Sequence, residues 1–136
     1  MPKILSLDVE EETLGLLNTI FKRAGYEHLH TTNSNEALSI LRKGDIDLFT
    51  QNILRADMDG CEFYRLMQSE DTLRDIPVLI ISSLTPPLLP KYCKSMLLQL
   101  YPHHFIPMPF GQKKLLAVVA AILESQTSTR DGSEIG

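Results

Sequence analysis

The sequence has little positive charge and no long apolar segment near its start. Its 136 residues include 13 lysines and arginines against 17 aspartates and glutamates, which gives a formal net charge of −4 at pH 7. Nucleic-acid binding depends on clustered basic residues that neutralise phosphates, so this balance argues against nucleic acid as the main partner. The first apolar run meets an acid at Asp8, which leaves it too short for a signal peptide or a membrane span. We therefore expect a cytoplasmic protein that binds other proteins and no membrane.

Cysteine is also scarce, because the chain holds Cys61 and Cys93 alone. Neither residue stands in a CxxC or other metal-ligand spacing, and two cysteines make no disulfide framework, so we expect a reducing compartment. The zinc alternative uses His28, His30 and the pair at 103–104, but nothing in the sequence brings these histidines together. Glycine-rich phosphate loops, nucleophile elbows and zinc-protease motifs are absent as well. The sequence thus predicts no metal site, no cofactor and no enzymatic activity. The histidines are expected to be solvated or to lie at a strand edge.

What the sequence does contain is an alternation of short apolar runs with amphipathic segments. Strands are predicted over residues 3–7, 27–31, 46–52, 77–83 and 105–106, each bounded by turn residues. Helices are predicted over 11–24, 34–44, 60–69 and 112–124, with a shorter helix from about residue 91 after three prolines. Ser34 is the predicted cap of the second helix. We expect one domain over residues 1–124, followed by a polar, mobile tail over 125–136.

This alternation predicts a three-layer α/β fold, in which helices cover both faces of a parallel sheet. The apolar run that begins at residue 46 ends in the polar Gln51 and Asn52, and the turn Met58-Asp59-Gly60 follows. Such sheets keep their sites where strands end in loops of this kind. The spacing from Asn52 to Gly60 resembles the third strand and following loop of response-regulator receiver (CheY-like) domains, and the resemblance covers roughly residues 3–124.

The resemblance implies a doubly wound, flavodoxin-like sheet with strand order 2-1-3-4-5. In that order the carboxyl ends of the first, third and fourth strands meet, which brings Asp8, Asn52 and Ser82 together. Receivers usually end the first strand with two acids that hold Mg²⁺, phosphorylate an aspartate, use a Ser or Thr as a switch, and place a lysine before a proline. The residues at these positions are Asp8 and Val9, Asn52, Ser82, and Met108. Glu10 follows Val9, but it does not stand at a principal ligand position.

These departures remove the groups on which the family's reaction depends. The amide of Asn52 is a far weaker nucleophile than a carboxylate, and Met108 carries no charge to stabilise a transferring phosphoryl group. One assured carboxylate is too few for tight Mg²⁺ binding. The resemblance therefore implies a pseudo-receiver in two-component, phosphorelay-type signalling that acts as a phosphorylation-independent interaction module for a histidine kinase or output protein. Two alternatives stay open: a small-ligand sensor in the less charged cleft, and a phosphoreceiver that uses an unusual residue.

Several residues also have plain structural interpretations. Asp8 could cap the following helix or accept backbone N–H bonds, and Ser82 could satisfy a local backbone group. Phe105 matches the family's aromatic switch position, yet a lone aromatic on a strand is more often core.

Residues 115–123 are nine consecutive apolar residues, more than a helix needs to cover one side of a sheet. This excess predicts an interaction face, for an output partner or a homodimer, made of Met96, Leu97, Leu100, Tyr101, Leu115 and Val119. The alternative is that the proline-rich segment 86–90 folds over the helix and buries the excess.

Overall fold

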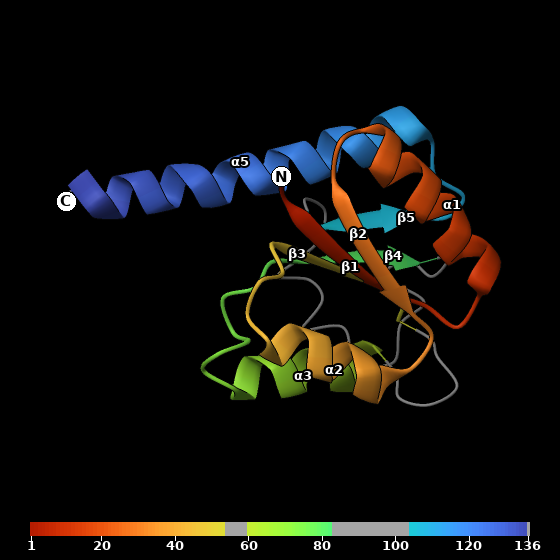
Figure 1. Ribbon diagram of the computed structural model, residues 1–136, viewed down its shortest axis with the longest axis horizontal. Helices are drawn as coiled ribbons and strands as arrows, with labels where there is room; N and C mark the ends of the chain where they lie inside the picture. The colour runs from red at the N-terminus through yellow and green to blue at the C-terminus, as the bar shows by residue number, and fades with distance from the viewer. Residues whose placement is uncertain (54–59, 83–103, 136) are drawn as a thin grey trace.

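The computed structural model describes residues 1–53, 60–82 and 104–135, with side chains as far as residue 126 (Figure 1). Five parallel strands form one sheet in the order β2-β1-β3-β4-β5, so the predicted fold is confirmed. The strands are β1 (Lys3–Leu7), β2 (Glu27–Thr31), β3 (Leu48–Gln51), β4 (Val78–Ser82) and β5 (Phe105–Pro107). The described helices are α1 (Glu11–Arg23), α2 (Ser34–Arg42), α3 (Gly60–Ser69) and α5 (Gln112–Ile135).

The sheet is the middle of three layers, with α1 and α5 on one face and α2 and α3 on the other (Figure 1). Because successive side chains of a strand point to opposite faces, β1 sends Leu5 into the α2–α3 core and Ile4 into the α1–α5 core. All five residues of β4 are buried. This burial on both faces explains why the central strands appear in the sequence as continuous apolar runs.

The cap of α2 is Asn33, whereas the sequence pattern predicted Ser34. The Asn33 side chain accepts a hydrogen bond from the backbone N–H of Glu36 at 2.9 Å. Ser34 is the first residue of the helix and is buried. Both residue types cap helices well, so composition could not separate them. The extended backbone of Asn33, with φ −111° and ψ 123°, makes it the cap.

The last helix is longer than predicted, because α5 continues from Glu124 to Ile135. Figure 1 shows its final turns extending past the body of the domain. The apolar pattern ends at Leu123, and this is where the sequence signal for a core-facing helix ends. The segment that follows contains no proline, so the backbone can stay helical after it leaves the core. The predicted helix end at Glu124 was therefore wrong.

Cys61 is fully buried and disulfide-bonded, whereas the sequence predicted no disulfide framework and a reducing compartment. The second cysteine of the chain, Cys93, lies outside the described residues, as does the helix expected from about residue 91. Sequence spacing predicts disulfides only in cysteine-dense frameworks, whereas an isolated pair depends on which elements the fold brings together. None of the described helices is long and apolar enough to cross a membrane.

Candidate functional site

The carboxyl ends of the central strands bring the predicted site residues to one edge of the sheet. Leu7 of β1 pairs with Gln51 of β3, so Asp8 and Asn52 are the next residues on neighbouring strands. The backbone N–H of Asn52 donates to the carbonyl of Leu7 at 3.4 Å. At the other side of β4, the carbonyl of Ser82 accepts the N–H of Met108 at 2.9 Å. The structure therefore gathers the residues that the sequence analysis expected at this edge.

Asp8 is buried, with 3% of its surface exposed. Its Oδ1 accepts the backbone N–H of Glu10 at 3.1 Å, and its own N–H donates to the carbonyl of Thr31 at 3.4 Å. Glu10 is the N-cap residue of α1, but its exposed side chain makes no cap hydrogen bond. The Asp8 carboxylate thus holds the loop that leads into α1, which agrees with its structural interpretation.

The neighbouring side chains bring little charge to this edge. Val9 is 40% exposed, and Met108 is partly buried against the α1–α5 core. Within residues 1–53, 60–82 and 104–135, no group of three or more His, Cys, Asp or Glu side chains could hold a metal ion. A receiver-type Mg²⁺ site needs several carboxylate oxygens, and the described residues at the strand ends supply the one carboxylate of Asp8. They do not fit such an ion.

The start of α3 packs directly against the backbone that follows β3. A Cβ atom built on Gly60 would lie 2.7 Å from both the carbonyl oxygen of Asn52 and the Cα of Ile53. The buried Gln51 side chain donates to the carbonyl of Gly60 at 3.2 Å. Gly60 is therefore required here by a close approach of two backbones. This contact holds the first residue of α3 against the backbone of Asn52 and Ile53.

A row of buried polar side chains lies below the strand ends, and the sequence analysis missed it. The Thr50 hydroxyl donates to Ser6 Oγ at 2.7 Å, and Ser6 Oγ lies 2.8 Å from Nε2 of His28. Nδ1 of His28 lies 2.9 Å from Oδ1 of Asn18 on α1. Ser6 and Thr50 precede Asp8 and Asn52 by two residues, so they lie on the same face of the sheet. This spacing of polar residues in apolar strands was the available signal.

His28 is held in its neutral form by this row. Since Asn18 presents a carbonyl oxygen, Nδ1 carries the proton and Nε2 accepts from the Ser6 hydroxyl. Burial lowers the pKa of His28 to about 4, with smaller contributions from the charges of His30 and Lys22. His28 and His30 share a face of β2 and stack with ring centroids 5.5 Å apart. His28 therefore lies on the edge strand β2, which is one of the two predicted environments, but it is not solvated, since it is 6% exposed.

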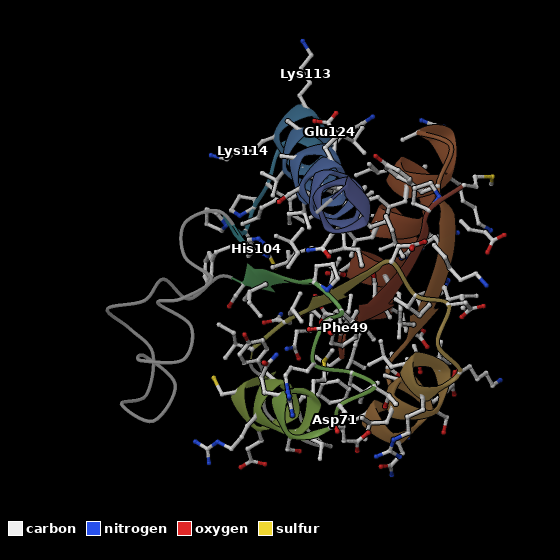
Figure 2. The ribbon with its side chains drawn as sticks, turned by 90° about the vertical axis from the view of Figure 1, so that its left-hand side faces the viewer. Phe49, Asp71, His104, Lys113, Lys114 and Glu124 are labelled. Carbon is white, nitrogen blue, oxygen red and sulfur yellow. The ribbon has the colours of Figure 1, made fainter. Side chains whose placement is uncertain are left out.

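Phe105 is 3% exposed and belongs to the α2–α3 core. Its place in this structure agrees with the core interpretation. Figure 2 shows Phe49, a member of the same core, enclosed between the sheet and the helices of that face.

The predicted interaction face needs a correction on α5. Leu115 and Val119 are fully buried in the α1–α5 core, so they cannot form an exposed face. The exposed members of the apolar run are Ala117 and Ala121, while Lys113 points away from the domain (Figure 2). The sequence showed that some apolar residues must face outward, but the rotation of the helix decides which. The other four predicted residues, Met96, Leu97, Leu100 and Tyr101, lie outside the described part of the chain.

Comparison with known proteins supports one family. Residues 4–120 match the model of the response regulator receiver domain. The polar-differentiation response regulator DivK of Brucella anthropi is 30% identical over 84 residues, which is 61% of this chain and 68% of DivK. The alkaline phosphatase synthesis regulator PhoP of Bacillus subtilis is 25% identical over 133 residues, covering 98% of this chain. The chain spans 53% of the length of PhoP.

Solved structures support the same fold. The chemotaxis protein CheY4 of Vibrio cholerae has a TM-score of 0.77 at 20% identity, covering 90% of this chain and 98% of CheY4. A CheY-like receiver domain protein of Methanospirillum hungatei has a TM-score of 0.81 at 18% identity, covering 95% and 98% of the two chains. Receiver domains generally interact with histidine kinases or output domains. The chain therefore belongs to the response regulator receiver domain family of two-component signalling.

Proposed function

We propose that this receiver domain is a protein-interaction module that works without aspartyl phosphorylation. The observation that carries the proposal is that Asn52 stands next to Asp8 at the edge where the paired strands β1 and β3 end, and that its side chain is an amide. An acyl phosphate forms when a carboxylate oxygen attacks phosphorus, and an amide is a far weaker nucleophile. Met108 adds a partly buried thioether rather than a positive charge, so the transfer would also lack electrostatic stabilisation.

Weak Mg²⁺ binding is the second part of the proposal. Asp8 is buried with one oxygen already accepting a backbone N–H, and Val9 offers hydrocarbon to the solvent. Mg²⁺ prefers an octahedral shell of carboxylate and water oxygens. We therefore expect no saturable binding below about 1 mM, or roughly 4 kcal/mol, in titration calorimetry. Saturable binding that disappears in Asp8→Ala would contradict this part.

The central test is phosphorylation itself. The protein is incubated with acetyl phosphate and Mg²⁺, and its intact mass is measured. We expect no phosphoryl adduct on the native chain and little on Asn52→Asp, because Val9 and Met108 remain. The triple variant Val9→Asp, Asn52→Asp, Met108→Lys should be labelled more. A stable adduct on the native chain would overturn the proposal, and peptide mapping would then identify the unusual acceptor residue.

For the interaction surface we propose the outer side of α5. Ala117 and Ala121 are exposed one turn apart, and Leu116 and Val118 beside them are partly buried. Small side chains allow another helix or a flat surface to approach closely, so this side suits an output partner or a second copy of the chain. If a dimer forms here, Ala121→Glu should lower the solution mass measured by light scattering. The control Gln112→Glu adds the same charge at an exposed position on the first turn of α5.

A further inference from the structure

A hollow of about 390 Å³ lies between α1 and the carboxyl end of β2. The described residues that line it are Glu11, Leu14, Gly15, His30, Thr31 and Thr32. None of them is Asp8, Asn52 or Ser82, so the hollow is distinct from the strand-end site. Its volume falls within the range of small-molecule sites, roughly 300–1,000 Å³.

Gly15 is the least expected residue in this lining. It lies in the middle of α1, where glycine costs about 1 kcal/mol relative to alanine. Its φ angle is not positive, because Gly25 and Gly44 are the described glycines with positive φ. A Cβ atom built on Gly15 would meet no heavy atom of the described structure within 4 Å. Neither backbone conformation nor close packing therefore requires glycine here. A larger side chain at this position would instead occupy space in the hollow.

The lining has a distinct chemistry. It combines one carboxylate, from Glu11, with the imidazole of His30 and two threonine hydroxyls, and no described lining residue is a lysine or an arginine. Leu14 closes the bottom of the hollow, but it is 2% exposed and adds little apolar surface. The ring of His28 stacks on His30 and supports its orientation. The one charged side chain among the described residues of this lining is an acid, which favours a cationic ligand, and a single carboxylate is too few for a hard metal ion.

We propose that this hollow binds a small organic molecule with a protonated primary amine. Its ammonium group pairs with the Glu11 carboxylate. A second polar group reaches His30 or the hydroxyl of Thr31. Thr31 Oγ1 accepts the backbone N–H of Asn33 at 3.1 Å, so its own O–H remains available to donate.

One backbone hydrogen bond links the lining of the hollow to the strand-end site. The carbonyl of Thr31 accepts the backbone N–H of Asp8 at 3.4 Å, so Thr31 contacts both the hollow and the residue beside Asn52. This connection exists whether or not the domain can be phosphorylated. The ligand site is therefore an inference separate from the proposed function, and either can fail without the other.

The test is a titration of the full ¹⁵N-labelled chain followed by amide chemical shifts. The amine probes are ethanolamine and 1,4-diaminobutane, and inorganic phosphate is the anionic control. We expect saturable shifts at residues 11–15 and 30–32 with the amines and none with phosphate. Absence of saturable shifts with both amines, or binding of phosphate in their place, would overturn the proposal.

Substitutions at two neighbouring acids distinguish a specific amine site from general attraction of amines to an acidic protein. Glu11→Gln removes the carboxylate that lines the hollow and should weaken amine binding about threefold to fivefold, because an exposed ion pair is lost. Glu12→Gln removes the same charge from the neighbouring residue, which is exposed and not among the lining residues. It should change binding by less than about twofold. An equal loss in both variants would overturn the proposal.

Filling the hollow gives an independent readout. Gly15→Leu places a side chain where a Cβ has room, so the variant should keep the native circular dichroism spectrum and lose amine binding. Native-like binding by folded Gly15→Leu would overturn the assignment. If this variant fails to fold, the pair Glu11→Gln and Glu12→Gln still decides the question.

Discussion

Replacing His28 with glutamine should remove most of the pH dependence of stability between pH 7 and pH 5. The native side chain is 6% exposed and is bonded through both ring nitrogens, to Asn18 and Ser6. Burial lowers its pKa from 6.5 to about 4 in the folded protein. In addition, Ser6 Oγ already accepts the Thr50 hydroxyl. A protonated His28 would have to donate to Ser6 Oγ through Nε2. The Ser6 hydroxyl hydrogen, which now points at Nε2, would then have to turn away.

The sign of the effect follows from proton binding. The unfolded chain binds a proton at His28 as the pH falls through 6.5, while the folded protein stays neutral until about pH 4. Stability is therefore lost as the pH falls through the unfolded pKa. The contribution of this group between pH 7 and pH 5 is about 2 kcal/mol, and the loss is nearly complete below pH 4.

The assay is urea unfolding followed by circular dichroism at pH 7, 6 and 5, analysed as the slope of stability against pH. His28→Gln lowers stability at every pH because it disturbs the buried row. Between pH 7 and pH 5, however, its free energy of unfolding should fall by about 2 kcal/mol less than that of the native protein. His30→Gln is the matched control, since His30 is exposed, and should keep most of the slope. Equal slopes in the native protein and His28→Gln would refute the reasoning, as would a His28 pKa near 6.5 measured by NMR.

Five further substitutions test the packing and the α2 cap by the same urea assay. Leu115→Glu should lower the free energy of unfolding by more than about 3 kcal/mol or prevent folding, because it buries a carboxylate in the core. Ala117→Glu, on the exposed side of the same helix, should change the free energy of unfolding by less than about 0.5 kcal/mol. Gly15→Ala should stabilise the protein by about 0.5–1 kcal/mol, since the new Cβ has room. Gly60→Ala should destabilise it by roughly 1–3 kcal/mol, since its Cβ would lie 2.7 Å from backbone atoms. Asn33→Ala should cost about 1 kcal/mol through loss of the α2 cap. A destabilised Gly15→Ala, a stabilised Gly60→Ala, or equal costs at 115 and 117 would contradict the packing described.

The sequence determined the elements of the fold because their signals are local. The predicted bounds of β1 and β2 match the structure, and the helix starts at Glu11 and Gln112 were also correct. Buried strands and helix faces carry their own periodicity in a few adjacent residues. The resemblance supplied the strand order that periodicity could not choose, and with it the meeting of Asp8 and Asn52 at one edge.

Tertiary structure decided what depends on residues far apart in the chain. The row from Thr50 through Ser6 to His28 joins positions 44 and 22 residues apart. Local spacing can mark polar positions in the strands, but it cannot show which of them bond to one another. The rotation of α5 against the sheet selected Leu115 for the core and left Ala117 exposed. Each of these outcomes rests on which surfaces the folded sheet and helices place in contact, because burial and hydrogen bonding depend on distance in space and not on separation in the sequence.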